Sequence, residues 1–468
     1  MPVPIISVEQ MREWERATWL NGQTEKKVIA RVGKLVAERA LAMTQLGEKI
    51  LILAGKGHNG DDARAALSHL TGRKVVLMEV REPKKSGVKF SEASADAMLI
   101  VDGLFGIGLN RPLAADWQKL IQSVNDSRIP VLAIDAPSGV DADSGEILGE
   151  AVRAAITLTL AAPKRGFFRA SAIPFVGRLE VASEIGLVPS PFRGELNWTL
   201  PKDFLNFPPT RPVTGHKGTF GHAAIVGGSL GYHGAAVLAT RAALRAQPGL
   251  ASVFTPENVY LPVAAQLQAA MVHPWKNPAQ LPETTSAILF GPGLAAKNLP
   301  NNLKREFISL WKTSALPMVA DAGALRWLPV EKKSRNANRV ITPHPGEAAE
   351  LLSMTTEKIQ ADRVSALRNL SARYGNCVVV LKGHQTLVGR ADGKVFINGS
   401  GNPFLAQGGS GDVLAGYITG LVAQPLLRDD FMKTICYAVW QHGAAADFLS
   451  ATQNNWTIEN LLETLGQK

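Results

Sequence analysis

Short apolar runs dominate the first half of the chain and predict buried strands. Residues 49–54, 74–80, 97–102 and 130–136 are rich in Val, Ile and Leu and show almost no polar alternation. Such runs are typical of strands buried on both faces of a parallel sheet. Residues 62–70 and 115–125 instead space their apolar side chains at helical intervals. The pattern therefore predicts an α/β fold whose parallel sheet is covered by helices.

A second alternation of strands and helices begins after a proline-rich interruption. Residues 186–217 show no periodicity, so we place the domain boundary there and expect domains over 1–195 and 205–468. Five further strands are predicted, at 222–228, 287–293, 317–323, 339–347 and 377–383, and each ends in glycine or a polar cluster. Ligands of open parallel sheets bind beyond the carboxyl ends of the strands. Five such ends in one domain therefore predict a binding site.

Composition and cysteine usage indicate a globular protein of a reducing compartment. Hydrophobic residues make up 46% of the 468 residues and charged residues 19%, which suits a chain with sizeable cores. No apolar run approaches the ~18 residues that a membrane span needs, and we see no signal peptide. Cys377 and Cys436 lie far apart, so core packing is their expected role. We expect a cytoplasmic protein with no membrane partner.

The net charge of +10 suggests acidic partners only weakly. The densest basic segments, residues 81–90 and 331–339, lie in loop-like polar contexts with few aromatic residues. This pattern favours a solvated surface, with a phosphate-bearing substrate as the next alternative. Nucleic acid, which basic segments interleaved with aromatic residues would favour, is not an expected partner.

The segment AQGGSGDVLAG, residues 406–416, places a flexible turn directly before a predicted helix at 413–424. Gly408, Gly409, Ser410 and Gly411 can direct backbone N–H groups at one point, and the helix N-terminus adds its positive dipole end. The turn can therefore hold a phosphoryl group. Asp412 is either a capping acid of the helix or a functional carboxylate.

Longer motifs around this turn resemble a known family. Residues 398–416 and 342–347 together resemble the ribokinase-like fold, in which a Gly-x-Gly-Asp turn holds a phosphoryl group and its aspartate deprotonates a hydroxyl. With residues 216–246, 290–294, 320–325 and 380–386 in the same order, the second domain resembles the ADP-dependent NAD(P)H-hydrate dehydratase family over residues 200–468. The resemblance implies a ribokinase-like α/β domain.

The first domain carries a glycine cluster of its own at residues 55–63. It has the form G-x-G-x-x-G, and Glu79 follows about twenty residues later, which alone is weak support for a dinucleotide-binding dehydrogenase. With residues 101–113 and 133–149, however, it resembles the NAD(P)H-hydrate epimerase family. The resemblance implies a Rossmann-like three-layer α/β/α sandwich, joined to the dehydratase domain as in bifunctional repair enzymes.

The dehydratase resemblance implies a substrate, a co-substrate and their binding residues. The substrate is NADH or NADPH hydrated at the nicotinamide ring, with the S configuration at C6, and ADP is converted to AMP and phosphate. Asp412 would accept the hydroxyl proton while the Gly409–Gly411 amides stabilise the transferring phosphoryl group. Mg²⁺ is expected with the nucleotide. The implied substrate residues are Ala235, Gly293, His344 and Asp412, and the nucleotide residues are Lys382, Gly383, His384, Gln385, Thr386 and Gly411.

For two positions of the second domain, a purely structural role is the alternative to a functional one. His344 lies between two prolines, where a hydrogen-bonded loop histidine is the alternative. Lys217 either neutralises phosphate or is an ordinary surface lysine. The sequence alone leaves both choices open.

The epimerase resemblance implies a second set of residues. Asp135 is the candidate acid/base group that helps to interconvert the R and S hydrates, unless Asp102 and Asp135 merely cap helices. Asn59, Asp102 and Ser138 match potassium-binding positions, and their oxygen atoms suit a hard monovalent cation. The implied substrate residues are His58, Asn59, Gly60, Asp61, Asp62, Gly106, Ile107, Gly108, Leu109, Asn110, Arg111, Pro112 and Asp135.

The glycine cluster departs from the family pattern. His58, Asp61 and Ala63 replace Asn, Gly and Gly, and residues 28–33 stand where a Leu-Met-Glu-like segment is usual. A carboxylate ~4 Å from a phosphate charge costs ~4 kcal/mol at an effective dielectric of ~20, unless Asp61 turns outward. A noncatalytic binding module is therefore the alternative for the first domain.

A vitamin-precursor kinase using ATP is the alternative for the second domain. It would share the glycine turn and its aspartate, but it explains neither the first domain nor the segment KGHQT at 382–386. The expected partners are hydrated NADH or NADPH, ADP and further copies of the chain in a homo-oligomer.

Overall fold

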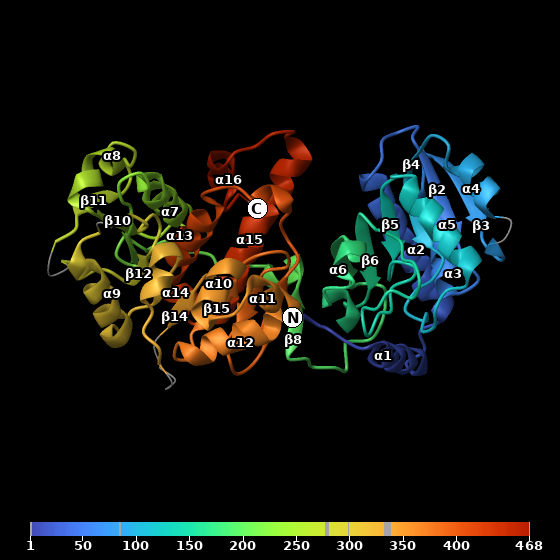
Figure 1. The fold of residues 1–468 in the computed structure, drawn as a ribbon, viewed down its shortest axis with the longest axis horizontal. Helices are drawn as coiled ribbons and strands as arrows, with labels where there is room; N and C mark the ends of the chain where they lie inside the picture. Colours follow the sequence, from blue (N-terminus) through green and yellow to red (C-terminus); the bar gives the residue numbers. More distant parts are fainter. Residues whose placement is uncertain (1, 84–85, 277–279, 298, 332–337, 468) are drawn as a thin grey trace. The chain divides into compact units, whose positions relative to one another are not determined.

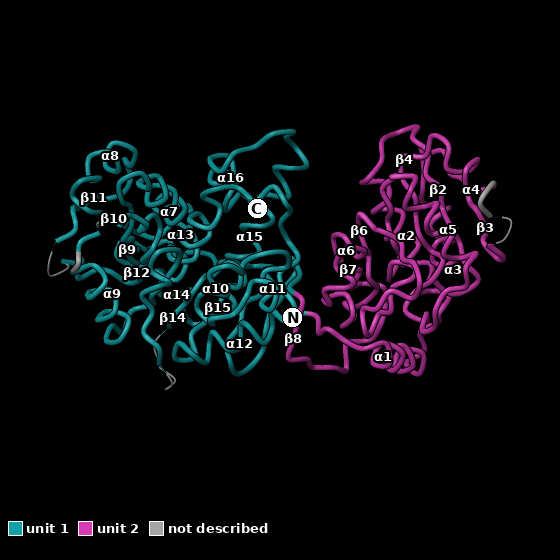
Figure 2. The backbone as a smooth tube through the Cα atoms, viewed as in Figure 1, with its two compact units in different colours: residues 1–2, 199–468 teal, residues 3–198 magenta. Residues whose placement is uncertain are grey.

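The computed structural model describes residues 2–83, 86–276, 280–297, 299–331 and 338–467. The chain divides into two compact units (Figure 2): unit 2 comprises residues 3–198, and unit 1 comprises residues 199–468 with the N-terminal dipeptide. The division lies between Trp198 and Thr199, within the interval from 195 to 205 that separates the two expected domains. Across the described residues, no helix is long and apolar enough to cross a membrane.

Unit 2 is built on a parallel sheet. Within the described residues this sheet has six strands in the order β3-β2-β4-β5-β6-β7. The predicted strands correspond to β2, β3, β4 and β5, whereas β6 and β7 were not predicted. The bounds are β2 (Lys49–Ala54), β3 (Lys74–Glu79), β4 (Ala97–Gly103), β5 (Val131–Ile134), β6 (Ile156–Leu160) and β7 (Arg178–Ala182).

Helices cover both faces of this sheet, as Figure 1 shows. α4 (Ser86–Ser94) and α5 (Ala115–Asp126) bury Phe90 and Leu120 against Leu51 and Leu53 of β2. On the opposite face, α2 (Glu25–Ala42) packs on α3 (His58–Ala66), where a Cβ at Gly33 would lie 2.5 Å from that of Ala65. The predicted three-layer α/β/α sandwich is confirmed. The remaining helices of unit 2 are α1 (Val8–Leu20) and α6 (Ile173–Val176).

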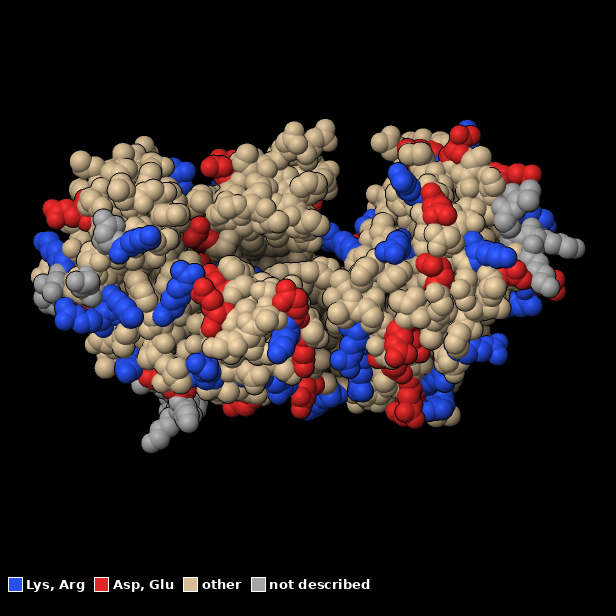
Figure 3. All heavy atoms as spheres, in the orientation of Figure 1, with Lys and Arg blue, Asp and Glu red and all other residues tan. Residues whose placement is uncertain are grey.

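Two local predictions in unit 2 were wrong. The helix expected from residue 62 begins at His58, so most of the glycine cluster lies within α3 rather than in a loop. The first basic segment was expected to be loop-like, but from Ser86 onward it belongs to α4. Residues 84–85 of that segment, and 332–337 of the other basic segment, lie outside the described residues. On the face of the molecule in Figure 3, basic and acidic side chains are intermingled.

The second sheet has the order β1-β8-β17-β16-β15-β14-β13-β12-β9-β10-β11 within the described residues, and its strands from β9 to β17 belong to unit 1. The predicted strands are β9 (His222–Val226), β12 (Ala287–Phe290), β13 (Met318–Ala320), β14 (Arg339–Ile341) and β15 (Val378–Leu381). They are parallel neighbours, so their carboxyl ends meet at one edge. The strands that were not predicted are β1 (Val3–Pro4), β8 (Leu196–Thr199), β10 (Leu250–Thr255), β11 (Met271–Pro274), β16 (Leu387–Gly389) and β17 (Val395–Asn398).

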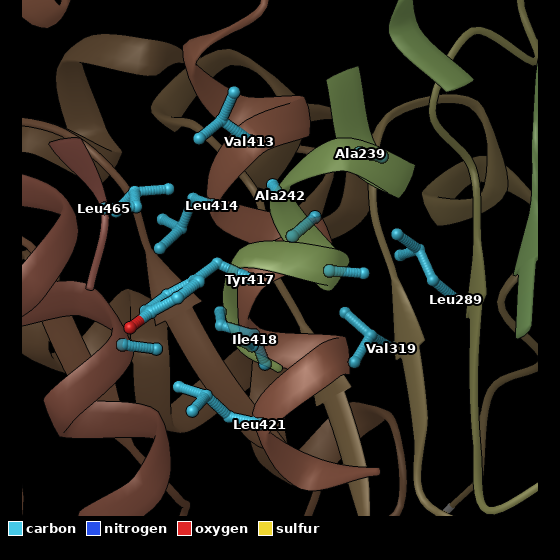
Figure 4. Close-up of a cluster of buried hydrophobic side chains, with 14 of the residues drawn as sticks. Ala239, Ala242, Leu289, Val319, Val413, Leu414, Tyr417, Ile418, Leu421 and Leu465 are labelled. Atoms are coloured by element: carbon cyan, nitrogen blue, oxygen red, sulfur yellow. The ribbon is translucent and has the colours of Figure 1, made fainter. Parts of the chain in front are cut away.

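A buried helix pair fixes the position of the glycine turn in unit 1. α13 (Ser410–Val422) packs on α7 (His233–Arg245) so closely that a Cβ at Gly416 would lie 2.0 Å from the carbonyl oxygen of Ala239. Figure 4 shows buried side chains of both helices, among them Ala239 and Ala242 of α7 and Tyr417 and Ile418 of α13. Only glycine permits the approach, and the packing therefore holds the N-terminus of α13 in place.

The other helices of unit 1 surround this pair (Figure 1). Both cysteines lie buried in unit 1 without a disulfide, so the prediction of core packing is confirmed. Burial raises the pKa of the Cys377 thiol to about 12. The remaining helices are α8 (Tyr260–Ala264), α9 (Asn301–Thr313), α10 (Pro345–Leu352), α11 (Thr356–Ala361), α12 (Arg363–Arg373), α14 (Pro425–Arg428), α15 (Phe431–Thr452) and α16 (Ile458–Thr464).

Candidate active sites

The glycine turn of unit 1 leads directly into α13. The helix begins at Ser410, three residues before the predicted start, and Gly409 is its N-cap. Gly409 has φ +97°, a backbone conformation that favours glycine, and a Cβ there would require the end of the Leu238 side chain to shift. The N–H groups of the first turn have no partner within a helix. The N–H groups of Gly411 and Asp412 are therefore available to an anion at the positive end of the helix dipole, whereas that of Ser410 donates to the Gln407 carbonyl oxygen (3.3 Å).

Asp412 lies in this first turn among other charged groups. Burial first, and then the carboxylates of Asp321 and Glu347 against the opposing ammonium of Lys382, together raise the pKa of its carboxyl to about 7. A carboxylate with this pKa is matched to accept a proton near neutral pH. The position predicted for the general base therefore has suitable electrostatics.

Lys382 connects the nucleotide motif with this carboxylate cluster. Its Nζ lies 2.9 Å from Asp321 Oδ1 and 3.9 Å from Glu347 Oε2. A Cβ at Gly411 would be only 3.2 Å from the same Nζ. Burial lowers the pKa of Lys382, but Asp321 and Glu347 outweigh it and the net direction is upward. The lysine is therefore a cation beside the glycine turn.

Sequence reasoning missed Asp321 and Glu347, although they lie inside the motifs at residues 320–325 and 342–347. Asp321 is almost fully buried at the end of β13 and accepts a 2.6 Å hydrogen bond from the Thr342 hydroxyl. The signal that could have identified it was an acidic residue directly after a buried strand, at the edge where the other motifs end.

His344 caps α10. Its Nδ1 accepts hydrogen bonds from the N–H groups of Gly346 (3.0 Å) and Glu347 (3.2 Å), while the Glu347 side chain accepts from the His344 N–H (2.8 Å). This capping box accounts for one ring nitrogen. Its other ring nitrogen, Nε2, lies 3.6 Å from Glu347 Oε2, and the His344 side chain is exposed.

The predicted substrate residues Ala235 and Gly293 lie next to each other. A Cβ at Gly293, where φ is +70°, would lie 3.2 Å from that of Ala235 and 2.2 Å from the carbonyl oxygen of Tyr232. Lys217 is exposed, which fits the surface alternative. Figure 3 shows unit 1 hollowed between the segments labelled α16 and α10 in Figure 1.

The candidate site of unit 2 centres on Asp135. This residue has φ +62°, and its Oδ1 accepts hydrogen bonds from Lys164 Nζ (2.6 Å), Leu160 N (3.1 Å) and Thr159 Oγ1 (3.4 Å). Lys164 is fully buried and also donates to the Leu160 carbonyl (2.9 Å). The capping alternative for Asp135 therefore does not describe its contacts. Sequence reasoning missed Lys164, which follows the unpredicted strand β6.

Two more carboxyl groups lie in the electrostatic field of Asp135. Burial first, and then the neighbouring carboxylates of Asp135 and Asp61, together raise the pKa of Asp62 to about 8. Burial and then Asp135 also raise the pKa of Glu15, a residue of α1 that the sequence did not indicate. Because environment separates the proton affinities of such groups, one can carry a proton where another accepts it.

Of the three predicted potassium-binding residues, Asp102 and Ser138 are connected by hydrogen bonds, whereas Asn59 is hydrogen-bonded to neither. Asp102 is fully buried and accepts hydrogen bonds from the Ser138 hydroxyl (2.7 Å) and the Ser138 N–H (2.9 Å). Burial raises the pKa of Asp102, against the lowering effect of these hydrogen bonds. Asn59 lies against Gly106, and its buried Nδ2 has no hydrogen-bond partner among the described residues.

The other predicted positions of unit 2 surround this centre. Gly60 packs on the backbone of Gly55, where a Cβ would meet the carbonyl oxygen at 2.1 Å. Residues 107–112 follow β4 in a loop that is mostly exposed. His58 is exposed and its Nδ1 lies 3.0 Å from Glu25 Oε1.

Asp61, the unusual acid of the glycine cluster, points toward a cation. Its Oδ1 lies 2.8 Å from Arg64 Nη1. The same arginine forms a 2.7 Å ion pair with Glu79 and donates a hydrogen bond to the Gly55 carbonyl. Glu79 is therefore engaged by Arg64, in place of the ribose contact expected of a dinucleotide fingerprint.

Comparisons with known proteins agree with this geometry. A family model described as NAD(P)H-hydrate dehydratase matches residues 223–467, and one described as YjeF-related protein N-terminus matches residues 77–166. A Bifunctional NAD(P)H-hydrate repair enzyme Nnr of Coxiella burnetii is 34% identical, over 94% of this chain and 93% of the relative. The protein of the same name from Escherichia coli K12 is 32% identical, over 96% and 90%.

Solved structures are similar to part of this chain. A ribokinase-like superfamily protein from Enterococcus faecalis V583 is 27% identical with a TM-score of 0.50, over 59% of this chain and 96% of that one. An ADP/ATP-dependent NAD(P)H-hydrate dehydratase from Bacillus subtilis, co-crystallized with ATP/Mg²⁺, is 32% identical with a TM-score of 0.49, over 55% and 91%.

Fold and site together define a two-domain α/β enzyme whose second domain is ribokinase-like. The near full-length similarity to the curated relatives specifies the family. The chain belongs to the family of bifunctional NAD(P)H-hydrate repair enzymes.

Proposed function

We propose that this chain repairs hydrated NADH and NADPH. Unit 2 interconverts the R and S hydrates, and unit 1 dehydrates the S hydrate with ADP, releasing AMP and phosphate. Family membership along nearly the whole chain supports both activities. The observation that carries the proposal is the position of Asp412, a carboxyl group with a pKa of about 7 in the first turn of a helix that begins at a glycine turn.

The residues of unit 1 suit phosphorylation followed by elimination. Hydroxide is a poor leaving group, so the C6 hydroxyl oxygen attacks the terminal phosphorus of ADP and AMP departs. Asp412 accepts the hydroxyl proton, while the first amides of α13 and the ammonium of Lys382 stabilise charge on the transferring phosphoryl group. Phosphate then leaves from C6 and a proton leaves from C5, which restores the ring double bond.

The other predicted residues keep binding roles in this scheme. Residues 382–386 and Gly411 bind the adenine nucleotide, and Ala235, Gly293 and His344 line the hydrated nicotinamide. Mg²⁺ would be held mainly through the nucleotide phosphates and supply charge neutralisation there. This agrees with the described residues, among which no three His, Cys, Asp or Glu side chains form a metal site.

In unit 2, two carboxyl groups share the acid/base work. Interconversion at C6 requires the hydroxyl to leave and water to return from the opposite face. Asp62, with a pKa of about 8, is protonated at neutral pH and can donate to the leaving hydroxyl. Asp135, which is held in place by hydrogen bonds from Lys164 and the Leu160 amide, accepts the proton of the incoming water. The carboxylate, amide and hydroxyl oxygens of Asp102, Asn59 and Ser138 fit a potassium ion, which would supply a fixed positive charge.

Product analysis tests the assignment of unit 1. Incubation of the S hydrate with ADP should yield NADH or NADPH, AMP and phosphate in equal amounts. A vitamin-precursor kinase would instead use ATP and leave a stable phosphorylated alcohol. Accumulation of such a product, without NADH, would exclude the dehydratase.

The full chain carrying Asp412→Asn tests unit 2 separately. Because dehydration is blocked in that variant, any equilibration of purified R hydrate into S hydrate reports epimerisation alone. A rate equal to the uncatalysed rate would assign unit 2 a noncatalytic binding role, the alternative suggested by Asp61 and Ala63.

A further inference from the structure

The end of β15 and the loop that follows it direct several backbone carbonyl groups at a single guanidinium group. Arg363, the first residue of α12, donates from Nη2 to the carbonyl oxygens of Leu381 (3.1 Å) and Lys382 (3.2 Å). Its Nη1 donates to those of His384 and Gln385, the latter at 3.3 Å. Four carbonyl groups from a five-residue stretch therefore converge on one side chain.

The backbone of this stretch is shaped for that contact. Gly383 has φ +130°, and a Cβ there would lie 3.3 Å from Arg363 Nη2. Gln385 has φ +55°, which is uncommon for a residue with a side chain. Such conformations persist only where surrounding contacts hold them, and the guanidinium hydrogen bonds are contacts of this kind.

The charge of Arg363 is balanced by carbonyl dipoles. Among the described residues no carboxylate lies within ion-pair distance of its guanidinium, and its Nε has no hydrogen-bond partner. Burial lowers the pKa of Arg363 to about 10, so the group still carries its charge at neutral pH. The loop is therefore its principal partner.

Turning the carbonyl groups inward leaves the amide groups of the loop available. Within the described residues, the N–H groups of Gly383, His384 and Gln385 have no acceptor, whereas that of Lys382 donates to Pro343. Successive unpaired N–H groups in a turn form a binding surface for a ligand acceptor or anion. Arg363 thus lies behind the loop, and the side chain of Lys382 reaches toward Asp321.

We propose that Arg363 is a positioning residue for ADP: it holds residues 382–385 in the conformation that binds the nucleotide. The inference rests on the proposed function of unit 1, which assigns ADP to this loop. Lysine cannot replace arginine here, because one ammonium centre lacks the planar fork that reaches several carbonyl groups at once. Charge alone is therefore insufficient.

Calorimetric titration of the full chain with ADP tests the proposal. We expect ADP to bind about 30-fold more weakly to Arg363→Met and about tenfold more weakly to Arg363→Lys, because hydrogen bonds to a charged group are lost. The matched control is Arg373→Met, at the exposed end of the same helix. Its affinity should equal that of the wild type.

Kinetics and hydrogen exchange separate positioning from a general structural role. Both Arg363 variants should raise KM for ADP while kcat at saturating ADP stays within about threefold, since the reacting groups remain intact. ADP should protect the amides of residues 383–385 from exchange in the wild type, and this protection should be lost in Arg363→Lys. If Arg363→Met does not fold, the lysine variant decides the question.

Two results would overturn the inference: ADP affinity within threefold of wild type in Arg363→Lys, or a fall in kcat with unchanged KM. Failure of the proposed function looks different. In that case the wild type itself binds no ADP, or releases no AMP and phosphate from the S hydrate.

Discussion

Replacing Asp412 by Asn should abolish dehydration and, at the same time, stabilise the protein at alkaline pH. The amide fills the same space but cannot accept the hydroxyl proton. The carboxyl pKa is raised from 3.8 to about 7, first by burial and then by Asp321. At 1.36 kcal/mol per pKa unit, ionising Asp412 in the folded protein costs about 4 kcal/mol more than in the unfolded chain.

The sign follows from proton binding. The unfolded chain loses this proton near pH 4, whereas the folded protein keeps it until about pH 7. Between those values the folded state binds more protons, so stability falls as pH rises, and above about pH 7 the loss is complete. The gain in unfolding free energy from Asp412→Asn should therefore grow by about 2 to 3 kcal/mol between pH 5 and pH 8.

Urea denaturation at both pH values measures this difference. The exposed residue Asp429 supplies the control, because Asp429→Asn should change stability equally at both pH values. Equal stability of wild type and Asp412→Asn at pH 8 would refute the electrostatic reasoning. Retention of more than about a tenth of the dehydration rate, only ~1.4 kcal/mol in barrier, would show that Asp412 is not the base.

The pH dependence of the wild-type rate gives an independent check. Only ionised Asp412 can accept the proton, so kcat/KM should rise about tenfold between pH 6 and pH 8. Asp321→Asn removes a carboxylate that raises the pKa of Asp412, and the midpoint should then move to lower pH. A wild-type profile that is flat from pH 5.5 to 8.5 would contradict both expectations.

Four further variants probe other contacts. Asp62→Asn should slow interconversion of the hydrates about 100-fold, and the wild-type rate should fall as pH rises through about 8, where the carboxyl loses its proton. Asp102→Ala should abolish any potassium-dependent rise in melting temperature, measured against choline chloride. Gly416→Ala places a Cβ 2.0 Å from the Ala239 carbonyl oxygen and should lower the unfolding free energy by about 1 to 3 kcal/mol. Asp61→Gly should tighten binding of the hydrated nucleotide less than about threefold at low salt, because the paired charge repels phosphate weakly.

The strands that place the unit 1 site could be predicted because burial on both faces leaves a continuous apolar run. β9 and β15 are examples, and their carboxyl ends carry the quoted motifs. The apolar run of a single strand does not show which strands are its neighbours in the sheet. That the carboxyl ends of the five strands lie side by side was therefore inferred from general rules about parallel sheets.

The missed strands break that pattern for physical reasons. β6 alternates apolar residues with Thr157 and Thr159, yet both threonines are fully buried. The Thr157 hydroxyl donates a 2.7 Å hydrogen bond to the Val176 carbonyl, which satisfies a polar group that would otherwise oppose burial. β16 spans only Leu387–Gly389 and pairs with its neighbours in antiparallel fashion, so it is too short to show a period.

Side-chain direction was the part of both sites that sequence could not supply. The repulsion expected from Asp61 assumed that its carboxylate faces a phosphate, yet Arg64 lies three residues along α3 and turns the charge toward itself. Arg363, at the first residue of its helix, likewise turns toward the carbonyl groups of the nucleotide loop. In both cases the effect of the charged side chain depends on the group that it contacts, and that group could be identified only from the structure. The same acid can therefore oppose substrate binding in one family member and be neutral in another, according to whether an arginine follows one helical turn later.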